Sequence, residues 1–243
     1  MNSQQIDLAA RGEQTEHSYL LGRLRGLVRG QQTEILAYDD PRILLDALTL
    51  ELRNGIYWDV VEAGPPVWRV RVRRREDVAA SDLVDLLTRD HVRVDHLFAT
   101  ALHRSNAGDM DTALAHFRVY AACLRRHVEA ENDLVVPVLS LPRSARGDDP
   151  TSIMLREHEE IIEHTVMIEE MLDEGMDDAG MLAPFFAIIS GQLAKHEWRE
   201  ENNLFPHWMR ALRHEPAIAD ELFPRVQGLV RAGDEAAATL GIE

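Results

Sequence analysis

A pattern of one histidine, one glutamate and one proline occurs twice in this chain with the same internal spacing. The first copy comprises His127, Glu131 and Pro137, and the second comprises His196, Glu200 and Pro206. Residues four apart on an α-helix project from the same face, because each residue advances the helix by about 100°. Each copy therefore presents an imidazole and a carboxylate together, and each pair can bind one metal ion or share two.

Each copy is preceded by a further histidine that directly follows an acidic residue. These histidines are His91, in Arg89-Asp90-His91, and His158, in Arg156-Glu157-His158, so that the whole unit repeats at an offset of 67 to 69 residues. Apolar residues at helical spacing flank all four histidines, which predicts that each one points into a helical core. Buried glutamates require cations, and no lysine or arginine lies on these faces. The predicted metal ligands are His91, His127, Glu131, His158, His196 and Glu200.

The pattern of hydrophobic residues predicts two domains with different folds. Residues 1–76 form a small two-layer α+β domain with the order βαβαββ: strands at 6–9, 33–38, 56–62 and 67–73, and helices at 17–29 and 42–53. Residues 79–243 contain no predicted strand. Four long helices, at 81–103, 109–138, 151–172 and 181–208, are joined by short breaks, which favours an all-α up-and-down four-helix bundle. A last helix at 218–240 packs on its outside.

The distribution of charge argues against two classes of partner. Residues 1–78 carry 11 Arg against 12 Asp and Glu, which leaves 15 Lys and Arg against 30 Asp and Glu in the remainder. An acidic surface repels phosphate backbones and anionic lipid, so neither nucleic acid nor a membrane is an expected partner. The N-terminal 20 residues show no export signal, and Cys123 is the single cysteine. These features predict a cytoplasmic protein.

The type of ligand limits the choice of metal. Imidazole and carboxylate without thiolate suit iron, manganese or zinc, and disfavour the structural zinc sites built from cysteine. Two six-coordinate ions held by six side chains keep positions open for an external ligand. Asp95, four residues after His91, is either a further metal ligand or a residue that contacts a ligand and orients it. We favour the second role. Tyr120 lines a ligand pocket or, more simply, belongs to the core. His96, His116, His164 and His207 lie off these faces or too far along their helices.

These residues resemble the four signature segments of the hemerythrin-like, HHE cation-binding family. Asp90-His91, His127 with Glu131, Glu157-His158 and His196 with Glu200 correspond to them in order, over about residues 79–210. The resemblance implies a four-helix bundle around a non-haem centre of two iron ions, with Glu131 and Glu200 as bridges and the histidines as terminal ligands. It also implies dioxygen or nitric oxide as the ligand.

One position departs from the oxygen-carrying members of that family. They have a second histidine on the third helix, where this chain has Ile162. The expected centre is therefore more open than an oxygen carrier's, which favours sensing or redox chemistry. Three functions remain: a module that binds or senses dioxygen or nitric oxide; a di-iron enzyme or iron donor in nitrosative or oxidative stress defence, which reduces nitric oxide or peroxide or repairs iron-sulfur clusters; and a purely structural zinc or manganese site.

Residues 5–75 resemble the small TusA-like fold. The resemblance rests on the strand ending in Asp39-Asp40-Pro41 and on the paired strands around Trp58 and Trp68. Sulfur carriers of that fold have a Cys-Pro near the start of the first helix, and the corresponding residues 11–16 contain neither cysteine nor proline. The resemblance therefore implies a docking or regulatory domain with a protein partner.

Overall fold

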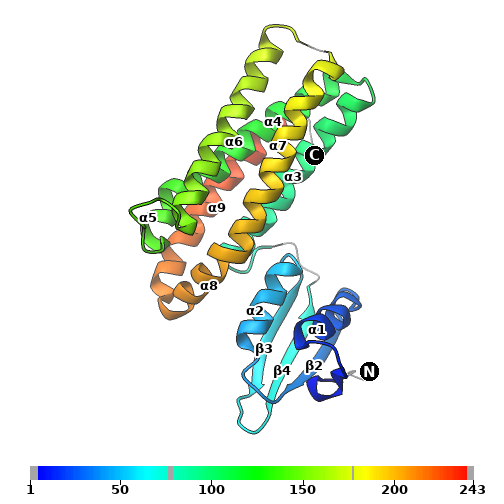
Figure 1. Cartoon of the computed structure of the whole chain (residues 1–243), viewed down its shortest axis with the longest axis vertical. Coiled ribbons are helices and arrows are strands. Elements are labelled where there is room, and N and C mark those ends of the chain that lie inside the picture. Colours follow the sequence, from blue (N-terminus) through cyan, green and yellow to red (C-terminus); the bar gives the residue numbers. More distant parts are fainter. Residues whose placement is uncertain (1–4, 76–78, 177, 240–243) are drawn as a thin grey trace. The chain divides into compact units, whose positions relative to one another are not determined.

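The computed structural model describes residues 5–75, 79–176 and 178–239, the last seven of these as backbone only. The chain divides into two compact units, residues 1–80 and 81–243. The first is a small sheet with helices and the second is helical (Figure 1). The predicted fold classes of both parts are confirmed. Among the described residues, no helix combines the length and the apolar character needed to cross a membrane.

The first unit has the predicted order of strands and helices. Its elements are β1 (Gln5–Asp7), a 3-10 turn η1 (Leu8–Arg11), α1 (Glu16–Arg25), β2 (Gln32–Ala37), α2 (Arg42–Glu51), β3 (Ile56–Glu62) and β4 (Trp68–Arg74). The sheet order is β1-β2-β4-β3, with β1 parallel to β2 and the other pairs antiparallel. In β4, Val70 and Val72 are buried while Arg71 and Arg73 are exposed, which is the alternation of a half-covered sheet.

Two predicted boundaries in this unit are wrong. The first strand ends at Asp7, whose side chain accepts a hydrogen bond from the Ala9 amide and starts the 3-10 turn. The first helix ends at Arg25 instead of residue 29, because Gly26 follows as its C-cap. Local hydrogen bonding and glycine thus end both elements before the hydrophobic pattern does.

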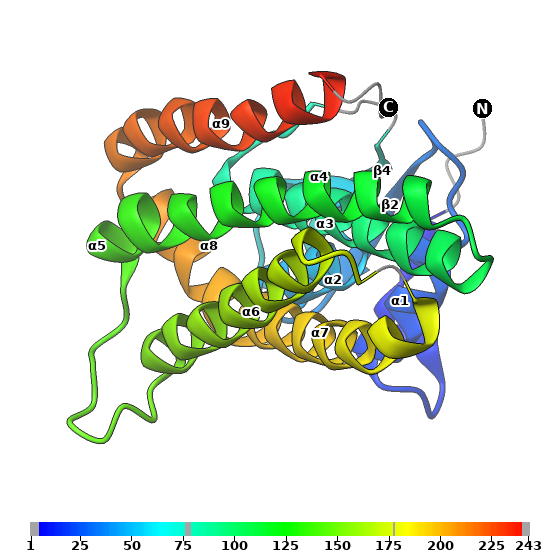
Figure 2. The same cartoon turned by 90° about the horizontal axis from the view of Figure 1, so that it is seen from above.

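The second unit is built on four long helices, seen side by side in Figure 1 and from above in Figure 2. They are α3 (Leu83–Asn106), α4 (Met110–Glu129), α6 (Pro150–Asp173) and α7 (Ala179–Arg199). Each begins at an aspartate whose side chain accepts a hydrogen bond from the backbone three residues on: Asp82, Asp109, Asp149 and Asp178. These N-caps satisfy amides that have no partner within the helix.

Shorter elements complete the bundle. They are the π-helical η2 (Ala130–Val135) with α5 (Val136–Leu139), the π-helical η3 (Glu200–Leu204) with α8 (Phe205–His214), and α9 (Pro216–Thr239). As predicted for the last helix, α9 lies along α4 and α3 (Figure 2), and it buries Leu222, Val226 and Val230.

The bundle interior is apolar on both sides of a polar layer. On one side Phe98, Phe117, Tyr120 and Phe186 pack with ring centroids 5.0 to 5.9 Å apart. On the other side lie Leu87, Leu139, Phe205 and Trp208, all buried. The two apolar regions fix the four helices rigidly, so that the layer between them has a defined geometry.

Candidate metal centre

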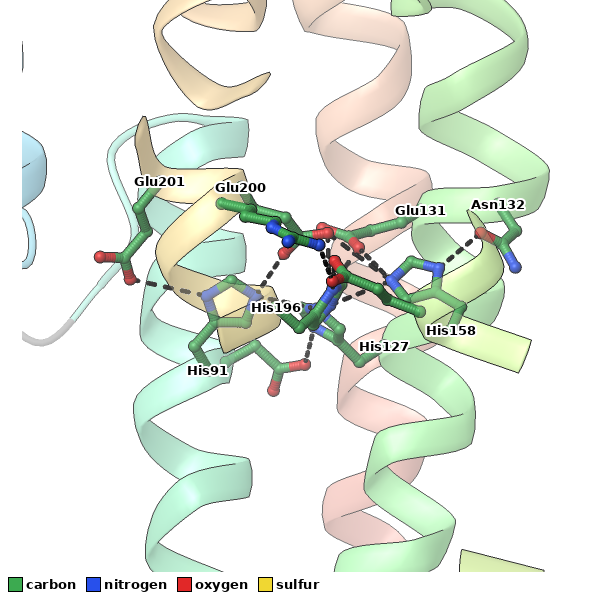
Figure 3. Close-up of polar contacts among 11 residues, drawn as sticks. His91, His127, Glu131, Asn132, His158, His196, Glu200 and Glu201 are labelled. Atoms are coloured by element: carbon green, nitrogen blue, oxygen red, sulfur yellow. Dashed lines mark hydrogen bonds and ion pairs between the residues drawn. The ribbon is translucent and has the colours of Figure 1, made fainter. Parts of the chain in front are cut away.

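The polar layer contains all six residues that the sequence predicts as ligands. Each long helix contributes one histidine, and the two π-helical segments contribute the two glutamates (Figure 3). All six residues are at most 3% exposed. Four imidazoles and two carboxylates thus come together in the middle of a closed bundle.

The two glutamates lie in short π-helical turns. The Val136 amide donates to the Glu131 carbonyl, and the Phe205 amide donates to the Glu200 carbonyl, so each bond spans five residues rather than four. Pro137 and Pro206 follow directly and cannot donate the next α-helical bond. The wider turn accommodates the proline, and such turns occur frequently at functional sites. The helices predicted at 109–138 and 181–208 are confirmed, and each contains a π-helical turn that the hydrophobic pattern did not predict.

The six side chains form two sets that share both glutamates. The first set is His91, His127, Glu131 and Glu200, and the second is His158, His196, Glu131 and Glu200. Within each set the two Nε2 atoms face each other, 3.1 Å apart for His91 and His127 and 3.2 Å apart for His158 and His196. Two donors at a right angle, each about 2.1 Å from one ion, are about 3 Å apart. The spacing fits two ions, each between two imidazoles.

The distances to the carboxylates agree with this arrangement. Glu131 Oε2 lies 3.6 Å from His127 Nε2 and 3.3 Å from His158 Nε2, and it therefore faces one imidazole of each set. Glu200 lies 3.1 Å from His91 Nε2 through Oε2 and 3.4 Å from His196 Nε2 through Oε1. All four carboxylate oxygens are buried and accept no hydrogen bond from the described part of the chain. A pair of cations between the carboxylates would compensate their charge.

Each of the four histidines has a polar side chain beside its outer nitrogen, Nδ1, and these four side chains form a ring around the bundle. Each Nδ1 faces a side chain from a neighbouring element, and that side chain is adjacent in sequence to another ligand. The pairs are His127 with Asp90 at 2.9 Å, His158 with Asn132 at 2.7 Å, His196 with Glu157 at 3.6 Å and His91 with Glu201 at 3.7 Å. Figure 3 labels the second and the fourth of these pairs. The hydrogen bonds to Asp90 and Asn132 fix the orientation of their imidazoles and direct Nε2 inward. The contacts of Glu157 and Glu201 are longer than hydrogen bonds and act on His196 and His91 through charge.

Two of these outer carboxylates are themselves paired with cations. Asp90 Oδ1 lies 2.6 Å from Arg93 Nη2, and the side chain of Asp90 is 1% exposed. Glu157 contacts the Arg199 guanidinium and lies 3.4 Å from Lys195 Nζ. Burial alone raises the pKa of Asp90, but His127 and Arg93 hold that pKa below its usual range. Both carboxylates are thus kept ionised behind their histidines.

The metal-free centre is strongly polarised. Burial acts to lower the pKa of His158, but Glu131 and Glu200 outweigh it and raise that pKa to about 9. The pKa of His91 is also raised well above its usual range, because Glu200 and Glu201 outweigh its burial. Burial acts to raise the pKa of Glu200, whereas His196 and His158 hold it well below its usual range. Without metal, these shifts favour protonated His91 and His158, and a cation that binds there must displace their protons.

The remaining candidates lie outside the six-residue cluster. Among the described residues Asp95 makes no hydrogen bond or ion pair, and the orienting position expected for it is taken by Asp90. Tyr120 packs on Phe98 and Phe117 in the apolar region, which supports its interpretation as a core residue. Ile162 packs against the same region. His116 and His164 bind Thr112 and Gln192 instead, at 2.9 Å each: the pairs are His116 Nδ1 with Thr112 O and His164 Nδ1 with Gln192 Oε1.

Four residues of the site were not assigned from the sequence: Asp90, Asn132, Glu157 and Glu201. Each is the immediate neighbour of a proposed ligand. A residue next to an inward ligand projects about 100° away around the helix, toward an adjacent helix. Acidic or amide side chains directly beside each ligand were therefore the available signal for the outer ring.

Comparisons with known proteins support one family. Searches of curated proteins and of solved structures return no match. The family model for the hemerythrin HHE cation binding domain matches residues 82–207, which is 126 of the 243 residues and contains all six clustered side chains. The match does not include the first unit, so its resemblance to the TusA-like fold stays a prediction. The chain belongs to the hemerythrin HHE cation-binding domain family.

Proposed function

We propose that the bundle holds two iron ions and binds or senses dioxygen or nitric oxide. The observation that carries this proposal is the pair of two-histidine sets that share Glu131 and Glu200, with carboxylate oxygens that accept no hydrogen bond from the described residues. Nitrogen and oxygen donors without thiolate suit iron, and manganese and zinc accept the same donors. When bound, iron would supply reversible binding of a diatomic ligand.

The residues of this chain have separate tasks in that function. Glu131 and Glu200 face both sets of histidines and would bridge the two ions. Asp90 and Asn132 accept hydrogen bonds from His127 and His158 and so keep their Nε2 atoms inward, in the form that binds a cation. The apolar residues on both sides of the layer bury all six of these residues.

The proposal is tested with protein purified anaerobically. Metals are counted by mass spectrometry, and optical spectra are recorded before and after dioxygen and then nitric oxide are admitted. Two iron ions per chain and a new reversible absorption band are expected. A single zinc ion with no spectral change would overturn the gas-binding function and leave a structural site.

We further propose that the first unit docks a protein partner. The support is that residues 1–76 contain no cysteine, which excludes thiol-based sulfur transfer by this unit. In addition, Tyr38 and Ile43, at the turn between β2 and α2, are 49% and 73% exposed. The single, buried Cys123 supports a reducing compartment, and we place the protein in the cytoplasm. Tyr38→Ser with Ile43→Ser should weaken co-purification of a partner without changing the metal content, and an unchanged partner would contradict docking through this turn.

A further inference from the structure

A cavity of about 130 Å³ lies against the metal centre. It lies between the first turns of α6 and the segment η3, and Glu200 forms part of its wall. Met154 and Leu204 supply apolar wall, while Glu157, Arg199 and Asn203 supply polar wall. A larger cavity of about 330 Å³, between α3, α8 and α9, is lined by none of the six clustered side chains.

The smaller cavity lies where a ligand from solution could reach the buried metal centre. All six clustered residues are at most 3% exposed, so a ligand from solution needs a path through the protein. The residues that line the cavity include the exposed Asn203 and the fully buried Glu200, so the cavity spans from the surface to a proposed ligand. We propose that this cavity is the access route and waiting site for the small ligand, an inference that rests on the proposed function.

The charges around the cavity define the class of ligand. Glu157 and Glu200 give the wall two negative charges, and Arg199 gives it one positive charge. Lys195 does not line the cavity, but it lies 3.4 Å from Glu157 and adds a second positive charge nearby. Such a wall exerts little net attraction on an ion. The inner wall, Met154 and Leu204, is apolar and buried. A volume of about 130 Å³ holds a few water-sized molecules, each of about 30 Å³ in the liquid. The cavity fits a small uncharged molecule, such as a diatomic gas.

The pair of Glu157 and Arg199 acts as a gate on this route. The side chain of Glu157 is 9% exposed and that of Arg199 is 36% exposed, which places the pair between solvent and the buried wall. Glu157 Oε2 also lies 3.6 Å from His196 Nδ1. Opening of the ion pair therefore widens the cavity and frees the residue behind one proposed ligand in the same movement.

Nitric oxide binding to the iron-loaded chain, followed by stopped-flow absorption, tests the route. Asn203→Trp fills the outer end of the cavity, and Ile153→Trp fills it from α6. Asn202→Trp is the matched control, because Asn202 is an exposed asparagine on the same π-helical segment that does not line the cavity. Arg199→Gln weakens the gate. Metal content is measured for every variant before the kinetics.

The rate constants and Kd together show whether the cavity is a route to the metal centre or part of the binding site itself. Asn203→Trp should lower both the association and the dissociation rate constants by about tenfold and leave Kd unchanged, since a barrier slows both directions equally. Arg199→Gln should raise both, and Asn202→Trp should change neither. If Asn203→Trp loses metal, Ile153→Trp carries the same expectation.

Two failures can be told apart. Unchanged rate constants in a metal-loaded Asn203→Trp or Ile153→Trp variant, with normal nitric oxide binding by the unmodified chain, would overturn the access route alone. No response to nitric oxide in the iron-loaded, unmodified chain would overturn the proposed function, and the access route with it.

Discussion

The two copies of the repeated histidine and glutamate pattern have the same local geometry and different surroundings. Both glutamates begin or lie within a π-helical turn that ends before a proline. Behind His127, however, stands Asp90, which is 1% exposed, 2.9 Å away and fixed by Arg93. Behind His196 stands Glu157, which is 9% exposed, 3.6 Å away and part of a cavity wall. One copy thus has a deeply buried aspartate behind its histidine, and the other has a glutamate that also lines the proposed access route.

This difference teaches that a sequence repeat specifies the inner ligands but not their environment. The residues that differ, Asp90 against Glu157, occupy equivalent positions, one before a histidine. The longer glutamate side chain reaches a partly exposed place where arginine and lysine meet it. The following predictions test how far the two halves are equivalent, starting with the largest effect.

Removal of either shared glutamate should damage both halves. Glu131→Ala and Glu200→Ala should each lower the metal content by at least one ion per chain, because each carboxylate faces a histidine of both sets. His96→Ala is the control, since His96 is exposed and outside the cluster. Mass spectrometry of the native proteins measures the metal content. Equal content in all three variants would contradict the assigned site.

Removal of the outer negative charges should lower metal affinity to a different extent in the two halves of the centre. Asp90→Asn should lower metal affinity by about 10- to 100-fold, the range typical of such partners. Glu157→Gln should have a smaller effect, because the carboxylate lies farther from His196 and closer to solvent. Competition with a chelator of known affinity measures both. Equal losses of metal affinity would contradict a stronger effect of the more deeply buried carboxylate.

The stability of the metal-free protein should fall as the pH rises from about 6.5 to about 9. The pKa of His158 is raised from 6.5 to about 9 in the folded chain. Its protonation therefore stabilises the fold fully below pH 6.5, and this contribution is lost as the pH rises through about 9. Thermal unfolding measured over this range, with and without metal, checks the prediction. A metal-free protein whose stability rises over this range would contradict it.

The smallest expected effect concerns Lys195. Its side chain is 57% exposed and lies 3.4 Å from Glu157, which also contacts Arg199. An exposed ion pair contributes little free energy to the position of either partner, so Lys195→Gln should change metal affinity by less than about twofold. The chelator competition used for Glu157→Gln measures it. A loss as large as that of Glu157→Gln would mean that Lys195, rather than Arg199, keeps that carboxylate in place.

Much of the fold could be predicted because hydrophobic spacing determines it. The alternation in β4 and the apolar faces of α3, α4, α6 and α7 gave the right elements in the right order. The two π-helical turns could not be predicted from that spacing, because one extra residue in a turn barely shifts an apolar face. Their only signal was the proline six residues after each glutamate, at Pro137 and Pro206.

The inner and outer parts of the site differed in how far the sequence revealed them. The six inner residues interrupt apolar faces, so each is conspicuous. Asp90, Asn132 and Glu157 look like ordinary surface residues of their own helices, and only the neighbouring helix makes them part of the site. Asp95 was the wrong choice for orientation for the same reason, since the spacing along α3 says nothing about where α4 places His127.

The ring of outer partners makes the four helices depend on one another in turn. The α3 helix positions a histidine of α4, the segment after α4 positions that of α6, α6 positions that of α7, and the segment after α7 faces that of α3. Because these contacts run from each helix to the next and back to the first, no helix is without a partner in the ring. Although the pattern occurs twice, neither half of the bundle contains all of its own supports. Cleavage of the chain between α4 and α6 should therefore yield two fragments that bind metal together and not separately.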